Sequence, residues 1–141
     1  METPKISITI QSTINAPVDK VWKAWTTPDD IIKWNSASDD WHTPRATNDL
    51  RVGGSFTSRM ESKDGSMGFD FGGTYLAVEE HKTIEYIMGD DRKVKVTFDG
   101  DQNQTNVTET FDAEETNSPE MQRDGWQSIL NNFKSYVEGQ N

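Results

Sequence analysis

The sequence contains no cysteine among its 141 residues. This absence excludes disulfide bonds, thiolate metal ligands and thiol nucleophiles. Only two histidines are present, His42 and His81, so a metal site built from several imidazole ligands is not expected. We therefore expect neither a bound metal nor a cofactor.

Positive charge and long apolar segments are also scarce. The chain has 14 Lys and Arg against 24 Asp and Glu, a net charge of -10, which repels phosphate backbones and anionic headgroups. No apolar run approaches the roughly 20 residues of a membrane span, and the N-terminal METPKISITI has no signal-peptide features. We expect a cytoplasmic protein that binds neither nucleic acid nor membrane.

The sequence is rich in aromatic residues for its polarity. Hydrophobic residues make up only 32% of the chain, yet it includes five Trp, six Phe and three Tyr. Because each aromatic side chain buries a large area, these residues are expected to carry much of the core. The length fits one domain over residues 1–141.

The N-terminal third predicts one strand and two short helices. Residues 5–14 alternate in polarity, as in a half-buried strand, with isoleucines on one face at Ile6, Ile8, Ile10 and Ile14. A first helix should follow Pro17 and bury Trp22 and Trp25. A second should begin at Thr27-Pro28 and carry Ile31, Ile32 and Trp34.

The remainder predicts an antiparallel sheet followed by a long helix. Residues 50–113 read as successive strands separated by turn signals, and a phase slip at Gly72-Gly73 suggests a bulge. A helix over 118–138 has an apolar stripe formed by Trp126, Ile129, Leu130, Phe133 and Val137. The expected fold class is α+β, with about seven curved strands wrapped around this C-terminal helix.

Several motifs within this element order resemble a known family. They are Ala16-Pro17-Val18 with VWKAWT at 21–26, Trp34, DLRVGGSF at 49–56, GGTY at 72–75 and Gly125-Trp126. The chain is similar to the START-like or Bet v 1-like (SRPBCC) superfamily, the helix-grip fold. Within it, the chain resembles the branch of the C-terminal domain of the activator of heat-shock-protein-90 ATPase homologue.

The resemblance implies a cavity between the long helix and the concave sheet face. Members of the superfamily use this cavity for lipids, polyketides, plant hormones and other apolar molecules, and occasionally for catalysis. Co-chaperone activity belongs to larger eukaryotic proteins with an additional N-terminal domain, so direct chaperone activation is not expected of these 141 residues. A chaperone-interacting role would rest on the family name alone.

Aromatic and methionine side chains on the inward faces are the candidate lining of such a cavity. The helix side would consist of Trp126, Leu130 and Phe133; the sheet side of Met60, Phe69, Phe71, Tyr86 and Met88; and the mouth of Trp34, Trp41 and His42. The expected ligand is a small hydrophobic molecule, and the expected state is a monomer.

Glu109 is the candidate polar anchor, since it lies in phase with Val107 and Phe111 and so faces inward. A buried carboxylate needs a partner or its pKa rises. It could orient a ligand, accept a hydrogen bond from Tyr75, Tyr86 or Trp126, or act as a base. Alternatively, the strand lies near an open edge and Glu109 remains hydrated.

The stretch ASDDWHTPR at 37–45 concentrates two carboxylates, a histidine and an arginine. Asp39 and His42 could ligate a metal, and Asp40 with His42 could form an acid-base pair. The preferred interpretation is a polar loop at the cavity mouth, in which Arg45 pairs with Asp39 or Asp40.

Two functions follow from these observations. A binding protein would enclose an apolar or aromatic molecule, whereas an enzyme would use Glu109 or His42 as a general base in the same cavity. No arrangement of nucleophile, base and orienting group is visible in the sequence, so binding is the favoured function and no catalytic residue is assigned.

Overall fold

The computed structural model describes residues 6–36, 38–89, 91–114 and 118–139. Its elements, in chain order, are β1 (Ser7–Ile14), α1 (Val18–Thr26), α2 (Pro28–Trp34), β2 (Trp41–Asn48), β3 (Ser55–Ser62), β4 (Gly68–Glu79), β5 (Thr83–Ile87), β6 (Lys93–Gly100), β7 (Thr105–Asp112) and α3 (Pro119–Glu138).

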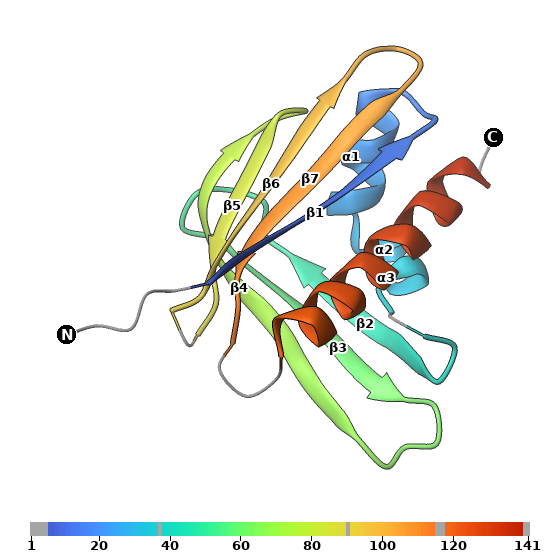
Figure 1. Ribbon diagram of the computed structural model, residues 1–141, viewed down its shortest axis with the longest axis vertical. Coiled ribbons are helices and arrows are strands. Elements are labelled where there is room, and N and C mark those ends of the chain that lie inside the picture. Colours follow the sequence, from blue (N-terminus) through green and yellow to red (C-terminus); the bar gives the residue numbers. More distant parts are fainter. Residues whose placement is uncertain (1–5, 37, 90, 115–117, 140–141) are drawn as a thin grey trace.

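The seven strands form one antiparallel sheet in the order β1-β7-β6-β5-β4-β3-β2. Figure 1 shows that the sheet curls and that α3 crosses its concave side. The helix-grip α+β fold expected from the sequence is therefore confirmed. Among the described residues, no helix has both the length and the apolar character needed to cross a membrane.

Local signals place the helix starts. Thr27 precedes Pro28, the first residue of α2. Proline has no backbone N–H, and it suits this position because an N–H there would have no partner within the helix. At α3, the Ser118 hydroxyl accepts a hydrogen bond from the backbone N–H of Met121 over 3.2 Å. Pro119 follows directly, so the predicted start of the long helix is confirmed.

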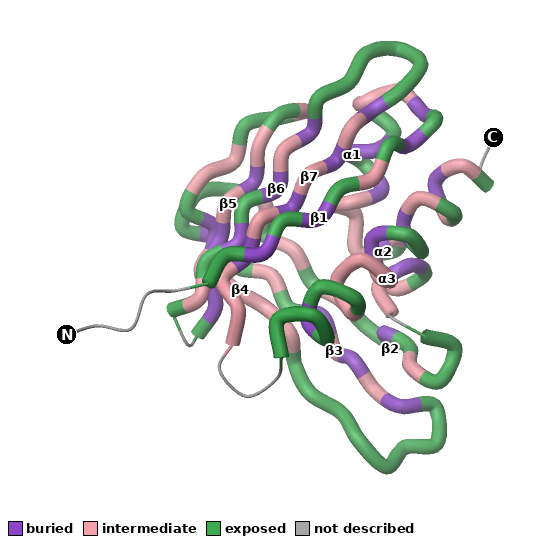
Figure 2. The backbone as a smooth tube through the Cα atoms, in the orientation of Figure 1, coloured by how far each residue is buried: buried purple, intermediate pink, exposed green. Residues whose placement is uncertain are grey.

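The core lies between the concave face of the sheet and the helices. Buried positions alternate along β1, β6 and β7 (Figure 2). Ile6 was expected on the buried face but is exposed; it lies just before β1, which begins at Ser7. Phe133 is fully buried, with its ring centroid 4.9 Å from that of Trp25 and 4.8 Å from that of Trp34.

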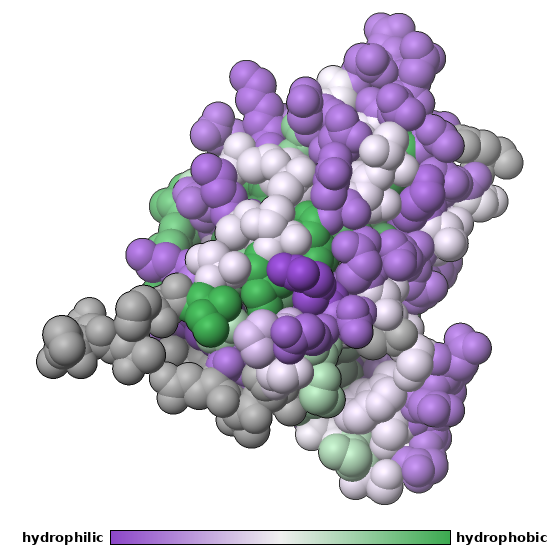
Figure 3. Space-filling view, in the orientation of Figure 1, coloured by the Kyte–Doolittle hydropathy of each residue, from purple (hydrophilic) through white to green (hydrophobic). Residues whose placement is uncertain are grey.

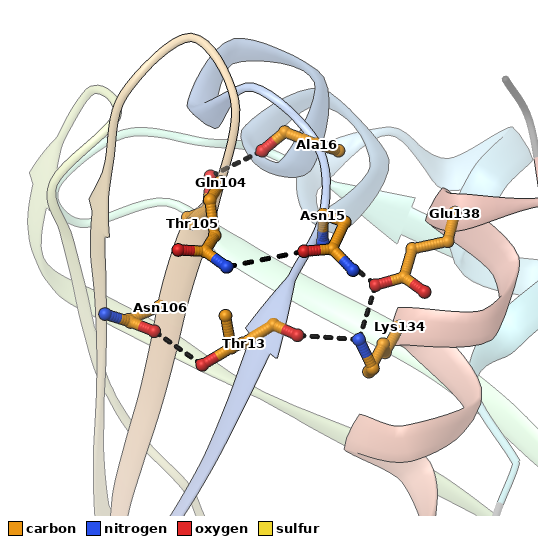
Figure 4. Close-up of polar contacts among 8 residues, drawn as sticks. All are labelled: Thr13, Asn15, Ala16, Gln104, Thr105, Asn106, Lys134 and Glu138. Atoms are coloured by element: carbon orange, nitrogen blue, oxygen red, sulfur yellow. Dashed lines mark hydrogen bonds and ion pairs between the residues drawn. The ribbon is translucent and has the colours of Figure 1, made fainter.

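The C-terminal half of α3 is fastened to β1 by polar contacts (Figure 4). The Lys134 ammonium donates to the Thr13 carbonyl oxygen over 2.7 Å and also to the Glu138 carboxylate. Glu138 in turn accepts from the Asn15 backbone N–H over 2.9 Å. Earlier in α3, Asn132 Nδ2 donates to the Trp34 carbonyl oxygen over 2.9 Å. These contacts hold this half of the helix against β1 and α2.

The expected loop at 37–45 is wrong over its second half, where β2 begins at Trp41. Residue 37 lies outside the described residues. The strand contains Pro44, which cannot donate to a neighbouring strand and is tolerated only at an edge or a bulge. Both conditions hold, because β2 is an edge strand and its register against β3 shifts between His42 and Arg45.

The expected bulge at Gly72-Gly73 is also wrong. These residues pair with β3 in continuous register, and the irregularity lies between Tyr75 and Ala77, against β5. A Cβ atom added at Gly73 would lie 2.7 Å from the Ile87 carbonyl oxygen. Glycine is therefore required for close approach of the strands.

Candidate functional site

A cavity of about 430 Å³ lies between the N-terminal half of α3 and the concave face of the sheet. This volume falls within the range of about 300–1,000 Å³ typical of small-molecule sites. The cavity is lined by Trp25, Ile31, Trp34, Asn35, Trp41, Phe56, Ser58, Met60, Phe69, Phe71, Tyr75, Ile84, Tyr86, Arg92, Glu109, Glu114, Gln122, Gly125, Trp126 and Ile129.

Nine of the lining residues are aromatic, and their rings meet mainly edge to face. The Tyr86 ring lies 4.7 Å from Phe56, at 79° to it. Trp126 stacks on Phe111 with centroids 4.0 Å apart and planes 10° apart, and its edge meets Phe71 at 5.9 Å. This packing holds the walls in fixed orientations and offers flat apolar surfaces to a ligand.

Gly125 provides space on the helix side of the cavity. It lies in the interior of α3 and lines the cavity. A Cβ atom added at this position would have no heavy atom within 4 Å. The site is therefore hollow where a larger residue would project from the helix.

Glu109 lies on the cavity wall and is only 5% exposed. Its neighbours across the sheet are Ile10 and Val96. Desolvation alone raises the pKa of Glu109 to about 8, and no hydrogen bond or ion pair among the described residues involves its side chain. β7 lies between β1 and β6, so Glu109 is not on an edge strand.

Other polar groups line the same cavity. Burial raises the pKa of Tyr86, and the charge of Glu109 raises it further. An Arg92 guanidinium nitrogen lies 3.9 Å from the Glu114 carboxylate. The Gln122 side chain accepts from the Glu114 backbone N–H over 2.8 Å and donates to its carbonyl over 3.1 Å. This pair of bonds connects the start of α3 to the chain after β7.

Eight of the predicted site residues lie on the cavity wall: Trp34, Trp41, Met60, Phe69, Phe71, Tyr86, Glu109 and Trp126. Tyr75, expected as a donor to Glu109, instead donates its hydroxyl to Asn48. The predicted interior side of β3, β4, β5 and β7 is thus the side that faces the cavity.

Four predicted site residues do not line it. His42 is exposed on β2, next to the inward-facing Trp41 and Thr43. Met88 is buried just beyond the end of β5. Leu130 and Phe133 are fully buried in the core, and the Phe133 ring packs against Trp25 and Trp34.

Several lining residues were not among those predicted from the sequence, including Trp25, Phe56, Gln122 and Gly125. A glycine within a helix costs stability relative to alanine, so Gly125 itself was a usable signal of a packing or functional role. Arg92 and Glu114 flank strands and meet only in the folded chain. Periodicity carries no information about such a pair.

The region around His42 shows no arrangement for metal binding. Within the described part of the chain, no group of three or more His, Asp or Glu side chains could hold a metal ion. The expected pairing of Arg45 with Asp39 or Asp40 is not among the ion pairs there. Instead, the pKa of Glu61 is lowered chiefly by its hydrogen bond from Arg59, with smaller contributions from Arg45 and His42.

Comparison with known proteins identifies relatives over almost the whole chain. The family model described as Activator of Hsp90 ATPase homolog 1-like protein matches residues 15–138. An AHSA1-like protein from Aeromonas hydrophila is 47% identical, with a TM-score of 0.89 over 96% of this chain and 94% of that one. A protein from Cytophaga hutchinsonii is 52% identical, with a TM-score of 0.81 over 95% and 93%.

More distant structures share the fold alone. A protein from Nitrosomonas europaea is 20% identical, with a TM-score of 0.81 over 96% of both chains. Comparison with curated proteins yields no match.

Proposed function

The chain belongs to the family of activator of Hsp90 ATPase homolog 1-like proteins, and we propose that it binds an apolar or aromatic small molecule between α3 and the sheet. Proteins with this fold typically bind hydrophobic ligands. The observation that carries the proposal is the 430 Å³ cavity, with nine aromatic residues in its wall.

The physical basis of binding is burial of apolar surface. Each Å² of apolar surface removed from water contributes about 25 cal/mol, so a ligand that fills the cavity can reach micromolar affinity with few polar contacts. The aromatic walls are already packed against one another. Little ordering of side chains is therefore required when the ligand enters.

Gly125 allows a direct test. Gly125→Phe should place a ring in the cavity, whereas Gly125→Ala adds a single carbon where space is open. The probe is the neutral fluorophore N-phenylnaphthylamine, titrated into each protein. Wild type and Gly125→Ala should show saturable emission, and Gly125→Phe should bind at least about tenfold more weakly. Equal binding by Gly125→Phe, or no binding by wild type, would overturn the proposal.

A second candidate function is acid-base catalysis in the same cavity. The observation that favours it is the buried Glu109 carboxyl group, whose pKa of about 8 lies near neutral pH, as a general base requires. Glu109→Gln keeps the shape but removes the titrating group. A binding protein should lose about tenfold or less in affinity for a neutral ligand, whereas an enzyme should lose about a hundredfold or more in turnover.

A further inference from the structure

Negative charges outnumber positive charges on the cavity wall. The charged lining residues are Glu109, Glu114 and Arg92. Arg92 lies 3.9 Å from Glu114, so these two charges offset each other. Glu109 is 5% exposed and makes no ion pair with another described residue. When Glu109 is ionised, the cavity wall therefore carries one negative charge that no positive charge balances.

Aromatic surface adjoins this carboxyl group. Phe111 and Glu109 are alternate residues of β7 and face the same side of the sheet. Trp126 stacks on Phe111 and lines the same cavity as Glu109. Tyr86 also lines the cavity and interacts electrostatically with Glu109. Cations are attracted both to the faces of aromatic rings and to carboxylates, so a cavity lined by both suits an organic ammonium ion.

We propose that the ligand of this cavity is an organic cation, with its ammonium group beside Glu109 and its apolar or aromatic body against Trp126, Phe71 and Tyr86. This inference rests on the proposed binding function and specifies its ligand class. The net charge of -10 acts in the same direction, since it attracts cations to the molecule and repels anions.

Other ligand classes fit this wall less well. An anionic ligand would add a further negative charge to a wall that already carries Glu109 and Glu114, within a strongly acidic chain. A neutral ligand would satisfy the apolar walls but would leave Glu109 either protonated or charged without a counter-ion. A cation supplies that counter-ion and favours the ionised carboxylate.

The proposal has a pH dependence that follows from burial. The other lining residues that can carry charge are Tyr75 of β4, Tyr86 of β5, Arg92 before β6 and Glu114 after β7, while α3 contributes no titratable side chain to the wall. Desolvation raises the pKa of Glu109 to about 8. Cation binding must then release the Glu109 proton, so affinity should rise by up to about tenfold per pH unit below pH 8 and level off above it.

The test uses two probes of the same shape, benzyltrimethylammonium and neopentylbenzene, in which a quaternary nitrogen replaces a quaternary carbon. The ammonium has no titrating proton, so pH dependence reports on the protein alone. Binding is measured by quenching of tryptophan fluorescence at pH 6 and pH 8. Wild type should prefer the cation by at least about tenfold at pH 8, and most of this preference should disappear at pH 6.

Two variants test whether Glu109 causes the preference for the cation. Glu109→Gln should abolish the preference for the cation and its pH dependence while still binding neopentylbenzene. Glu85→Gln is the matched control, because it changes the net charge equally but lies opposite Lys95 on the outer face of β5. It should retain the preference for the cation.

Each other outcome has a defined meaning. If neopentylbenzene binds wild type as tightly as the cation at both pH values, the cation inference is overturned and the binding function stands. If the preference survives Glu109→Gln, the inference is likewise overturned. If neither compound binds, the proposed binding function fails together with the inference.

Discussion

Glu109 is the residue at which stability and function conflict. A carboxyl group buried among Ile10, Val96 and Phe111 is disfavoured in its charged form, because the protein interior solvates charge poorly. An apolar residue of similar volume at this position would avoid that cost. The proposed role of Glu109 as the polar group that holds the ligand explains why a carboxyl group occupies this buried position.

The first prediction concerns the pH dependence of unfolding. The pKa of Glu109 is raised from 4.5 to about 8 by burial, so between these values the folded state binds more protons than the unfolded state. Wild type should therefore lose stability relative to Glu109→Gln as the pH rises through this window, by up to about 1.4 kcal/mol per pH unit. The difference should be constant below pH 4 and above pH 9.

Urea denaturation of both proteins across this pH range provides the measurement. The two free energies of unfolding should diverge as the pH rises. If they run parallel between pH 5 and pH 8, Glu109 does not titrate as a buried group.

Individual residues were predictable to different degrees. The alternation around Glu109 predicted that it faces inward, and the structure confirms this burial. Its low exposure depends also on β7 lying between β1 and β6. That neighbour relationship is set by tertiary pairing, which the period of a single strand does not encode.

Among the elements, α3 has two halves with different roles. Its C-terminal half is fixed to β1 by Lys134 and Glu138, and Phe133 fills the space beneath it. Its N-terminal half, which includes Gly125 and Trp126, covers the cavity. The proposed site therefore lies under the half of the helix without that aromatic filling.

The second prediction concerns the start of α3. The Ser118 hydroxyl accepts from the Met121 backbone N–H and so satisfies one of the unpaired donors at the helix N-terminus. Ser118→Ala should reduce the free energy of unfolding by about 1 kcal/mol, whereas Ser118→Asp should retain the cap. Chemical denaturation measures both. Equal loss in the two variants would contradict a capping role.

The third prediction concerns the interior of α3. Gly125→Ala should raise the free energy of unfolding by about 0.5–1 kcal/mol, because alanine has the higher helix propensity and its Cβ meets open space. Thermal denaturation should show a higher Tm than wild type. A lower Tm would mean that the methyl group clashes and that the cavity is closed at this point.

The sequence predicted some features of the helices and strands and missed others, for physical reasons. The stripe from Trp126 to Val137 predicted which face of α3 is buried, and Leu130 and Phe133 are indeed fully buried. Helical spacing does not distinguish a residue that packs on Trp34 from one that borders a void. The strand β2 was missed because its polar residues and Pro44 match an edge strand no better than a loop.

For the whole molecule, the acidic charge and the aromatic interior have separate effects. The aromatic core provides the cavity walls, while the net charge of -10 governs which partners approach. In the face shown in Figure 3, hydrophilic residues predominate and hydrophobic ones occupy a limited area. Large exposed hydrophobic side chains are spread over several elements and turns, for example Val52, Leu76 and Met121.

The fourth prediction is that the chain is a monomer in solution. Like-charged molecules repel, and scattered apolar residues do not provide the large continuous patch of a stable interface. Sedimentation equilibrium at micromolar concentration should give a mass near 16.0 kDa. A mass twice this value, independent of salt concentration, would show that a further surface mediates assembly.

The central claim is that the cavity beneath α3 holds a small organic molecule. Native mass spectrometry of wild type and Gly125→Phe, both purified gently from the original host, tests this claim most directly. Wild type should carry one additional small molecule per chain, and Gly125→Phe, whose added ring occupies the open space at that position, should carry none. Identical masses for the two proteins, after correction for the substitution, would contradict the claim.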